Sequence, residues 1–557
     1  MPDAPLLEIE SLTFRYRRAT EPALRDLSLT MRDGEVLLVA GPSGCGKSTL
    51  IRAINGLIPH AYRGEMSGAI RLVGRSTGEM RLREISLSVG TLLQDPAKQI
   101  VGSTVEAELA FGPENLGWSP AAIRDRIASV VEAVGIEALA ERETFALSGG
   151  ERQLIAMAGA LMLEPRLLVI DEPLANLDPA TAHRLLGLLR DLADAGRCVI
   201  MVEHRVEDAL LLRPDRVLYL ENGATRYLGA VDGFLRAADP EAVRLPFEVV
   251  LEHERKRAPG PTSALPPRPA ADPSAAERLV FRDVRVNLGD REVLAGLSAG
   301  LGAREVVAVL GPNGSGKTTL LRTGMGLLRP HAGTVEVNGA SITGRTVAEL
   351  ARVFGYVFQS PSQMLFSRTV REELLFGPRN LGHPIGDPDT FSMSLLRRTS
   401  LDNEDGILDR PPMTLSFGQQ KRLALAIALG LQPPTLVLDE PSAGQDHRTA
   451  NAFLDEVLAI AGLESVYLVT HDVDLALTRA DRILVLRDGR VVANGPPAKV
   501  IEDEELWIAC NLQITSLMRA NRAWRPPEGR LLDAATLAGY VVSQQGGPRP
   551  TETDSRL

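Results

Sequence analysis

Two glycine-rich stretches contain the residue types needed to hold a chain of phosphates. One is GPSGCGKST at 41–49 and the other is GPNGSGKTT at 311–319, and each directly follows an apolar run. Glycine lets backbone N–H groups wrap phosphate oxygens, a lysine reaches the terminal phosphates, and the next hydroxyl can ligate Mg²⁺. The candidate phosphate-binding residues are Gly41, Pro42, Ser43, Gly44, Cys45, Gly46, Lys47, Ser48 and Thr49, and Gly311, Pro312, Asn313, Gly314, Ser315, Gly316, Lys317, Thr318 and Thr319.

An acidic pair follows another apolar run in each half of the chain. The pairs are Asp171-Glu172 and Asp439-Glu440. Downstream of a phosphate-binding loop, the aspartate is expected to hold Mg²⁺ and the glutamate to polarise an attacking water. These pairs therefore predict hydrolysis of a nucleoside triphosphate.

A glutamine and a histidine complete the set in each half. The glutamines are expected to approach the metal and the attacking water, and the histidines can donate a hydrogen bond to charge that develops on the γ-phosphate. The predicted metal-binding residues are Ser48, Gln94, Asp171, Thr318, Gln359 and Asp439. The predicted catalytic residues are Glu172, His204, Glu440 and His471.

These motifs recur in the same order at a nearly constant spacing along the chain. The matched positions are Lys47 and Lys317, Gln94 and Gln359, Asp171 and Asp439, and His204 and His471. LSGGE at 147–151 and LSFGQ at 415–419 form a fifth pair with the same spacing as the acidic pairs, but Phe417 stands where the first copy has Gly149. The repetition indicates a tandem duplication of a domain of roughly 230–250 residues, too long a period for a solenoid.

The composition limits the classes to which the chain can belong. Its 557 residues are 44% hydrophobic and 24% charged, as in ordinary globular domains. A net charge of −10 argues against a general nucleic-acid binder, and three scattered cysteines indicate a reducing compartment. We expect no secretory signal at the N-terminus, and the longest apolar run, 154–163, is about half the length that spans a bilayer. Any membrane role is therefore expected to act through a partner.

Short apolar runs alternate with amphipathic stretches in each copy. This alternation is typical of an α/β fold whose parallel strands are covered on both faces, and the motifs follow the strands at the edge where such sheets bind ligands. The expected divisions are residues 1–250 for the first domain, 251–277 for a proline- and alanine-rich linker, 278–500 for the second domain, and 501–557 for a C-terminal extension with a disordered tail.

With these residues in this order, the chain resembles the ATP-binding cassette (ABC) ATPases over about 8–250 and 279–500. The resemblance implies ATP and Mg²⁺ as cofactors and, in each P-loop NTPase domain, a mainly parallel core sheet, an antiparallel β subdomain and an inserted α-helical subdomain. It also implies that Asp178 and Asp446 belong to D-loops. The signature residues that it implies are Ser148, Gly149, Gly150 and Glu151, and Ser416, Phe417, Gly418 and Gln419.

In that family two domains close head to tail around two ATP molecules, and each signature contacts the γ-phosphate held by the other domain. The resemblance therefore implies pairing of the two domains within this one chain. Tyr16 matches the aromatic residue that stacks on adenine, whereas the second copy has Leu288. Because both sites keep the lysine, the metal residues, the base and the histidine, we expect both to hydrolyse ATP with unequal affinities or rates. We therefore interpret Phe417 as a residue that distinguishes the second domain from the first, and not as a sign of an inactive ATP site.

The segments after the glutamines narrow the resemblance. Residues 92–117 and 357–382 both end in Phe-Gly-Pro-x-Asn-Leu-Gly and look like the pattern of energy-coupling-factor importers and their cobalt-type relatives. In those systems two such domains lie under an integral membrane scaffold protein and a small membrane substrate-binding protein, at the cytoplasmic face of a bacterial cell membrane. They take up a vitamin or a transition-metal ion. This region would receive the scaffold's coupling helices, and no nucleic-acid partner is expected.

Two other functions stay open on the sequence. A soluble tandem cassette protein could act on ribosomes, although such factors join their domains by a long, charged, helical linker and this linker is short and rich in proline. The chain could also be the ATPase of an importer for sugars or peptides, against which only the pattern after the glutamines argues.

Overall fold

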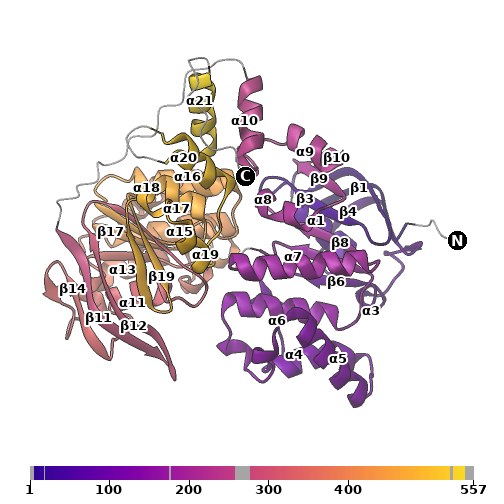
Figure 1. The fold of residues 1–557 in the computed structure, drawn as a ribbon, viewed down its shortest axis with the longest axis horizontal. Helices are drawn as coiled ribbons and strands as arrows, with labels where there is room; N and C mark the ends of the chain where they lie inside the picture. The colour runs from indigo at the N-terminus through magenta and orange to yellow at the C-terminus, as the bar shows by residue number, and fades with distance from the viewer. Residues whose placement is uncertain (1–4, 18, 175–176, 258–275, 527–530, 546–557) are drawn as a thin grey trace. The chain divides into compact units, whose positions relative to one another are not determined.

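The computed structural model describes residues 5–17, 19–174, 177–257, 276–526 and 531–545. The chain divides into two compact units, the first reaching His253 and the second comprising most of the chain that follows. Among the described residues, each unit has one four-stranded and one six-stranded sheet (Figure 1). Most of the predicted linker and most of the predicted disordered tail (544–557) lie outside the described residues.

The six-stranded sheet of the first unit has the order β10-β9-β3-β8-β7-β6. All its pairings are parallel except that of the edge strand β10. Every residue of β3, β7 and β8 is buried, which explains the continuous apolar runs in the sequence. The strands are β3 (Val36–Ala40), β6 (Val89–Leu92), β7 (Leu167–Asp171), β8 (Cys198–Val202), β9 (Arg216–Glu221) and β10 (Ala224–Gly229).

An antiparallel sheet and ten α-helices accompany the six-stranded sheet in the described residues up to Lys256. The sheet order is β2-β1-β4-β5. Its strands are β1 (Leu7–Tyr16), β2 (Leu24–Met31), β4 (Gly64–Leu72) and β5 (Arg75–Ser76). The α-helices are α1 (Lys47–Ile54), α2 (Leu57–His60), α3 (Leu82–Ser86), α4 (Val105–Asn115), α5 (Pro120–Val134), α6 (Gly149–Leu161), α7 (Pro179–Asp194), α8 (Val206–Ala209), α9 (Val231–Ala237) and α10 (Phe247–Lys256).

The second unit repeats this topology. Its sheets have the orders β12-β11-β14-β15 and β16-β17-β18-β13-β19-β20. The strands are β11 (Glu277–Leu288), β12 (Arg291–Gly302), β13 (Val306–Leu310), β14 (Ala332–Val337), β15 (Ala340–Ser341), β16 (Phe354–Val357), β17 (Thr435–Asp439), β18 (Ser465–Val469), β19 (Arg482–Arg487) and β20 (Arg490–Gly495). The α-helices are α11 (Lys317–Gly324), α12 (Val347–Leu350), α13 (Val370–Asn380), α14 (Pro388–Arg398), α15 (Phe417–Gly430), α16 (His447–Leu458), α17 (Val473–Arg479), α18 (Pro497–Val500), α19 (Glu504–Ala509), α20 (Ser516–Trp524) and α21 (Ala534–Gln545).

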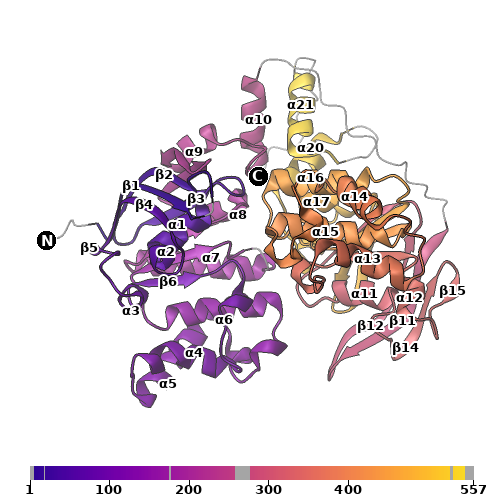
Figure 2. The same ribbon diagram turned by 180° about the vertical axis from the view of Figure 1, so that it is seen from behind.

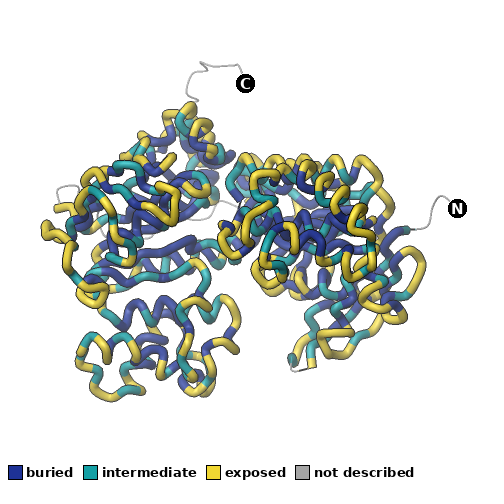
Figure 3. The backbone as a smooth tube through the Cα atoms, turned by 90° about the horizontal axis from the view of Figure 1, so that it is seen from below, coloured by how far each residue is buried: buried dark blue, intermediate teal, exposed yellow. Residues whose placement is uncertain are grey.

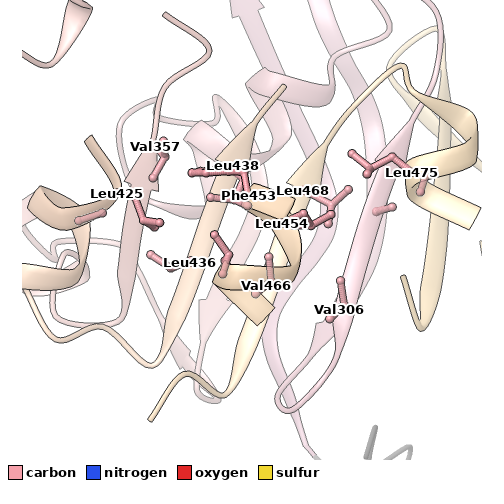
Figure 4. Packing of buried hydrophobic residues seen from close by; sticks show 14 of the residues in the cluster. Val306, Val357, Leu425, Leu436, Leu438, Phe453, Leu454, Val466, Leu468 and Leu475 are labelled. Carbon is pink, nitrogen blue, oxygen red and sulfur yellow. The ribbon is translucent and has the colours of Figure 1, made fainter. Parts of the chain in front are cut away.

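The core of the second unit lies on both faces of its parallel sheet. Along β18, Val466 and Leu468 enter one apolar cluster, and Tyr467 and Val469 enter the other. This alternation follows from the two-residue period of a strand. Figure 4 shows the first cluster, in which Phe453 of α16 packs near the leucines and valines of β17 and β18.

Three helices between β6 and β7 form the helical subdomain of the first unit. Figures 1 and 2 show α4, α5 and α6 as one group set apart from β1 and β4. Ser119 caps α5 through its side chain, Pro120 starts the helix, and Gly135 ends it in the left-handed region with φ of 72°. The second unit places α13, α14 and α15 between β16 and β17 in the same way.

Both connecting regions contain more helix than their composition suggests. α10 continues to Lys256 because Phe247 and Val250 form a buried stripe on it. Beyond residue 500, the indole nitrogen of the fully buried Trp507 donates to the carbonyl oxygen of Val500 at 2.8 Å, and Met518 enters the core of the second unit. The described part of the extension is therefore packed helix. Figure 3 shows that buried residues occur within both units. No helix in the described residues is both long and apolar enough to span a bilayer.

Candidate active sites

Each glycine-rich loop joins the end of a central strand to the start of a helix. The first connects β3 to α1 and the second connects β13 to α11. Gly46 and Gly316 end the loops with φ of 109° and 99°, which an L side chain rarely adopts. A Cβ atom at Gly46 would lie 2.5 Å from the backbone oxygen of Ala23. The shape of the loop therefore requires glycine at this position.

The loop lysines lie over the carbonyl groups of their own loops. The Nζ atom of Lys47 donates to the oxygens of Gly41 and Pro42 at 2.7 and 2.8 Å. Lys317 donates to Gly311 at 2.8 Å in the same manner. Both lysines are buried, so the positive charge is held at the loop and not in bulk solvent.

The loop hydroxyls lie beside the aspartates of the acidic pairs. The Oγ atom of Ser48 donates to Oδ2 of Asp171 at 3.3 Å, and Oγ1 of Thr318 donates to Oδ1 of Asp439 at 3.2 Å. Mg²⁺ prefers a few oxygen ligands and keeps several waters, so a hydroxyl next to a carboxylate suits it. When bound with ATP, Mg²⁺ neutralises charge on the phosphates.

The glutamates of the acidic pairs are in contact with the predicted histidines. The Nε2 atom of His204 lies 3.0 Å from Oε1 of Glu172, and Nε2 of Gln94 donates to Oε2 of the same glutamate at 2.9 Å. In the second copy, Nδ1 of His471 lies 2.9 Å from Oε2 of Glu440. Gln359 stands at the same distance along the chain after β16 as Gln94 after β6.

Glu172 and Glu440 also share an unusual backbone conformation. Each has φ of 50°, which is uncommon for a residue with a side chain and is found mainly where the surroundings enforce it. Their N–H groups donate to Val202 and Val469 on the neighbouring strand at 2.9 and 2.8 Å. The backbone therefore fixes where each carboxylate points.

The electrostatics of the acidic pairs differ between the two carboxylates. Burial raises the pKa of Asp171 to about 6, and the adjacent Glu172 contributes. Burial also acts to raise the pKa of Glu172, but its interactions with His204, Gln94 and Lys47 outweigh this effect and the net pKa is lowered. Contact with His471 likewise lowers the pKa of Glu440 despite burial. Both glutamates are thus kept ionised, as a group that polarises water requires.

The two signature motifs begin helices α6 and α15 with a capping box. The Ser148 hydroxyl accepts from the N–H of Glu151 at 3.3 Å, and the Glu151 carboxylate accepts from the N–H of Ser148 at 2.7 Å. Ser416 and Gln419 repeat this exchange at 3.3 and 2.9 Å. Phe417, the first residue of α15, is 43% exposed and takes no part in the cap. The pairing of each signature with the other copy's loop stays a prediction.

The residues expected near adenine differ between the copies as the sequence indicates. The hydroxyl of Tyr16 lies 3.2 Å from that of Thr49 and accepts from Nη1 of Arg52 at 2.9 Å. Leu288 is the last residue of β11 and is 47% exposed. The stacking role of Tyr16 stays a prediction.

The D-loop candidates lie where helices begin. Asp178 caps α7 by accepting from the N–H of Thr181 at 3.1 Å. Asp446 directly precedes α16. In both copies the aspartate therefore closes the segment that starts at the acidic pair.

Sequence reasoning missed one polar position on each signature helix. The Nε2 atom of Gln153 donates to the backbone oxygen of Glu172 at 3.2 Å, and Nζ of Lys421 donates to the backbone oxygen of Pro441. Both side chains are fully buried. In the sequence, Gln153 and Lys421 are separated by the same number of residues as the two signature motifs, and this repeat could have identified them as equivalent positions.

The parallel sheets, the glycine-rich loops and the acidic pairs together define a P-loop ATPase with two nucleotide-binding domains. The sequence profile of the ABC transporter family matches residues 24–175 and 294–443, and the chain belongs to that family. Its activity is ATP hydrolysis with Mg²⁺.

Two relatives match this chain over nearly its whole length. An ABC transporter ATP-binding protein of Methanosarcina acetivorans is 34% identical over 545 residues, covering 90% of this chain and 88% of its own. A similarly named protein of Streptomyces avermitilis is 34% identical over 551 residues, covering 89% and 95%. The structure of CbiO1 from Clostridium perfringens, described as part of the ABC transporter complex CbiONQ, is 31% identical and covers 45% of this chain and 99% of its own, with a TM-score of 0.37.

Proposed function

We propose that the protein is the ATPase subunit of an energy-coupling-factor-type importer at the cytoplasmic face of a bacterial membrane. Its two domains pair head to tail within the chain and drive uptake of a small micronutrient, a vitamin or a transition-metal ion. A membrane scaffold protein transmits the motion, and a small membrane substrate-binding protein selects the cargo. The observation that supports this proposal best is a repeated set of exposed apolar side chains.

Three exposed apolar positions occur on the helical subdomain of each copy. Each position in the first copy has a counterpart in the second. The two are separated by the same number of residues as the glutamines or as the signature motifs. The pairs are Val101 and Phe366 (63% and 66% exposed), Phe111 and Phe376 (52% each), and Phe145 and Met413 (74% and 59%). We call each set of three a docking face. Exposed apolar groups that gather on one surface are typical of a site that binds a partner, and the ring centroids of Phe366 and Phe376 lie 4.8 Å apart.

A buried glutamate fixes the loop that presents each docking face. The Oε2 atom of Glu108 accepts from the N–H groups of Val101 and Gly102, both at 2.7 Å. Glu373 does the same for Phe366 and its neighbour at 3.0 and 2.8 Å. These bonds hold irregular backbone in one shape, so the apolar side chains are positioned before a partner arrives.

The first docking face is connected to the catalytic cluster through a short loop. Gln94, which donates to Glu172, precedes Val101 by only seven residues in the chain. The occupant that we propose is a short cytoplasmic helix of the membrane scaffold, whose apolar side would cover the aromatic residues. Movement of this helix and changes at the γ-phosphate would then be coupled through the loop.

The chemistry of the proposed cycle follows from the cluster around each glutamate. Glu172 and Glu440 orient and polarise the attacking water, and the loop lysines bind the β- and γ-phosphates. The histidines, in contact with the glutamates, can donate to the γ-phosphate as its charge develops. We propose that each site is completed by the other domain's signature, so that hydrolysis separates the domains and moves the docking faces.

Affinity purification of the full chain from detergent-solubilised membranes of its source organism tests the proposal. We expect a polytopic membrane protein to co-purify. Recovery of ribosomal proteins in its place would overturn the importer role and favour a ribosome-associated ATPase. Only the importer role, and not the ATPase activity, depends on this result.

A double variant shows whether the docking faces make the contact. Phe111→Ser with Phe376→Ser should reduce recovery of the membrane protein at least about tenfold while the ATPase activity of the purified chain persists. Leu211→Ser is the matched control, because Leu211 is 51% exposed but lies outside both docking faces. Equal recovery with the double variant and the control would contradict the role of the docking faces.

A further inference from the structure

A tyrosine hydroxyl contacts the metal-binding carboxylate in the second copy. Tyr356 on β16 donates to Oδ2 of Asp439 at 2.7 Å, while Oδ1 of Asp439 accepts from Thr318 at 3.2 Å. Each oxygen of this carboxylate therefore has its own hydroxyl donor. Such a pair of bonds fixes the rotation of the carboxylate about its last bond.

The first copy has a different residue at the matching position. Thr91 is the third residue of β6, as Tyr356 is of β16, and each is paired in register with a valine of the next strand. A threonine is shorter than a tyrosine by the whole aromatic ring. Asp171 accepts from Ser48 at 3.3 Å, close to the 3.2 Å between Thr318 and Asp439, so the two copies differ in the tyrosine donor.

The arginine after each lysine approaches a different tyrosine in each copy. Arg52 donates to the hydroxyl of Tyr16 at 2.9 Å, on the strand expected to face adenine. Arg322 is its counterpart, five positions after the loop lysine in the same way, and its Nε atom approaches the hydroxyl of Tyr356 at 3.5 Å, a long contact. The second copy has Leu288 in place of Tyr16, and leucine offers no acceptor. The tyrosine that contacts this arginine thus lies near the expected adenine position in the first copy and beside the metal-binding aspartate in the second.

We propose that Tyr356 is a positioning residue of the second site, whose hydroxyl sets the Asp439 carboxylate so that its other oxygen faces the Mg²⁺ held with Thr318. The second site then gains affinity for the metal-bound form of ATP, which offsets the missing aromatic residue at Leu288. The first site relies more on Tyr16 and less on the orientation of its aspartate. This proposal rests on the predicted metal role of Asp439 and is independent of the importer role.

The surroundings of Tyr356 suit a fixed donor. Its hydroxyl is a neutral hydrogen-bond donor and lies 2.7 Å from the Asp439 carboxylate. Its ring packs against that of Phe358 with the centroids 4.4 Å apart, and Phe358 directly precedes Gln359. The tyrosine is therefore held by both its ring and its hydroxyl.

Nucleotide binding to the full chain tests the role of the hydroxyl. In a Lys47→Ala parent, which weakens the first site, calorimetric titration with ATP reports on the second site. Tyr356→Phe should raise the Mg²⁺ concentration needed for half-maximal ATP binding about three- to tenfold. ATP affinity measured in EDTA should not change. EDTA removes the Mg²⁺, so the orientation of the Asp439 carboxylate no longer affects binding.

Two further variants separate positioning from a structural effect. In a Lys317→Ala parent, which leaves the first site, Tyr356→Phe should not alter the Mg²⁺ dependence. In the same parent, Thr91→Tyr should lower the Mg²⁺ requirement, because its longer side chain adds a hydroxyl donor for Asp171. An unchanged Mg²⁺ dependence of Tyr356→Phe in the Lys47→Ala parent, or an equal loss of affinity with and without metal, would overturn the proposal. Absence of ATP binding in the Lys47→Ala parent would contradict a functional second site and the proposal with it.

Discussion

The Nε2 atom of His204 lies 3.0 Å from the Oε1 atom of Glu172, and both side chains are buried. In the second copy the other ring nitrogen, Nδ1 of His471, makes the contact, at 2.9 Å from Oε2 of Glu440. The Nδ1 atom of His204 is buried and has no hydrogen-bond partner among the described residues. The two clusters therefore share their composition but not their geometry, which fits sites with unequal rates.

The Glu172→Gln and Glu440→Gln variants, made separately, should each hydrolyse ATP more slowly than the wild type. Glutamine keeps the size of glutamate but cannot take a proton from the attacking water. Turnover measured by phosphate release should fall by the share of the disabled site if the two sites act independently, and by more if they are coupled. ATP binding is the control and should persist in both proteins. Full turnover in either protein would show that the site it disables was never active.

Replacement of Phe417 by glycine should leave hydrolysis largely intact. The side chain is 43% exposed, and the cap formed by Ser416 and Gln419 does not use it. Ser416→Ala serves as the contrasting variant, because it removes that cap and should cost about 1 kcal/mol of stability. A change in turnover of tenfold or more with Phe417→Gly, about 1.4 kcal/mol in barrier, would show that the aromatic side chain takes part in catalysis.

The sequence was sufficient to place the phosphate loops, the acidic pairs and the histidines on one edge of each sheet. Their spacing and the apolar runs before them depend only on local chain geometry. The left-handed φ of 50° at Glu172 and Glu440 could not be foreseen, because it is imposed by bonds to the neighbouring strand. The same holds for the contact of Tyr356 with Asp439, two residues that are 83 positions apart.

Some positions were hidden by their local composition. Lys421 follows two glutamines at the start of a helix, a pattern that resembles a solvated face. It is nevertheless fully buried, because the carbonyl groups of the segment after Glu440 need a donor that the backbone does not supply. The packed helix around Trp507 lies in the segment that the sequence marks only as a C-terminal extension, since the burial of this side chain depends on the rest of the second unit.

Gly418→Ala should separate the stability of α15 from its function. A Cβ atom there would meet nothing within 4 Å among the described residues, and alanine favours a helix over glycine. The thermal midpoint should hold or rise, whereas turnover should fall if the ATP held by the Lys47 loop approaches this glycine. Gly187→Ala in α7 is the matched control with equally open space, and it should keep both properties. Unchanged turnover with Gly418→Ala would contradict the composite-site prediction.

Lys421 is a buried base whose charge depends on pH. Burial lowers the pKa of its ammonium group to about 7, and nearby Glu440 opposes this only in part. Its Nζ atom donates to the backbone oxygen of Pro441, approaches Oε1 of Gln445 at 3.5 Å and lies 5.5 Å from the centre of the Phe453 ring. In the unfolded chain the same lysine keeps its ordinary pKa of 10.5.

Stability should therefore depend on pH through Lys421. Between about pH 7 and about pH 10 the unfolded chain binds a proton that the folded chain does not, so this residue's contribution to the free energy of unfolding rises with pH. Below about pH 7 both states are protonated and the cost of burying the charge is fully present. The thermal midpoint of the wild type relative to Lys421→Met should thus increase from about pH 6.5 to about pH 9. Gln153→Met, at the matching position of the first copy, replaces a group that does not titrate and should show a difference from wild type that is flat with pH. Equal slopes for the two variants would mean that Lys421 keeps its charge when buried.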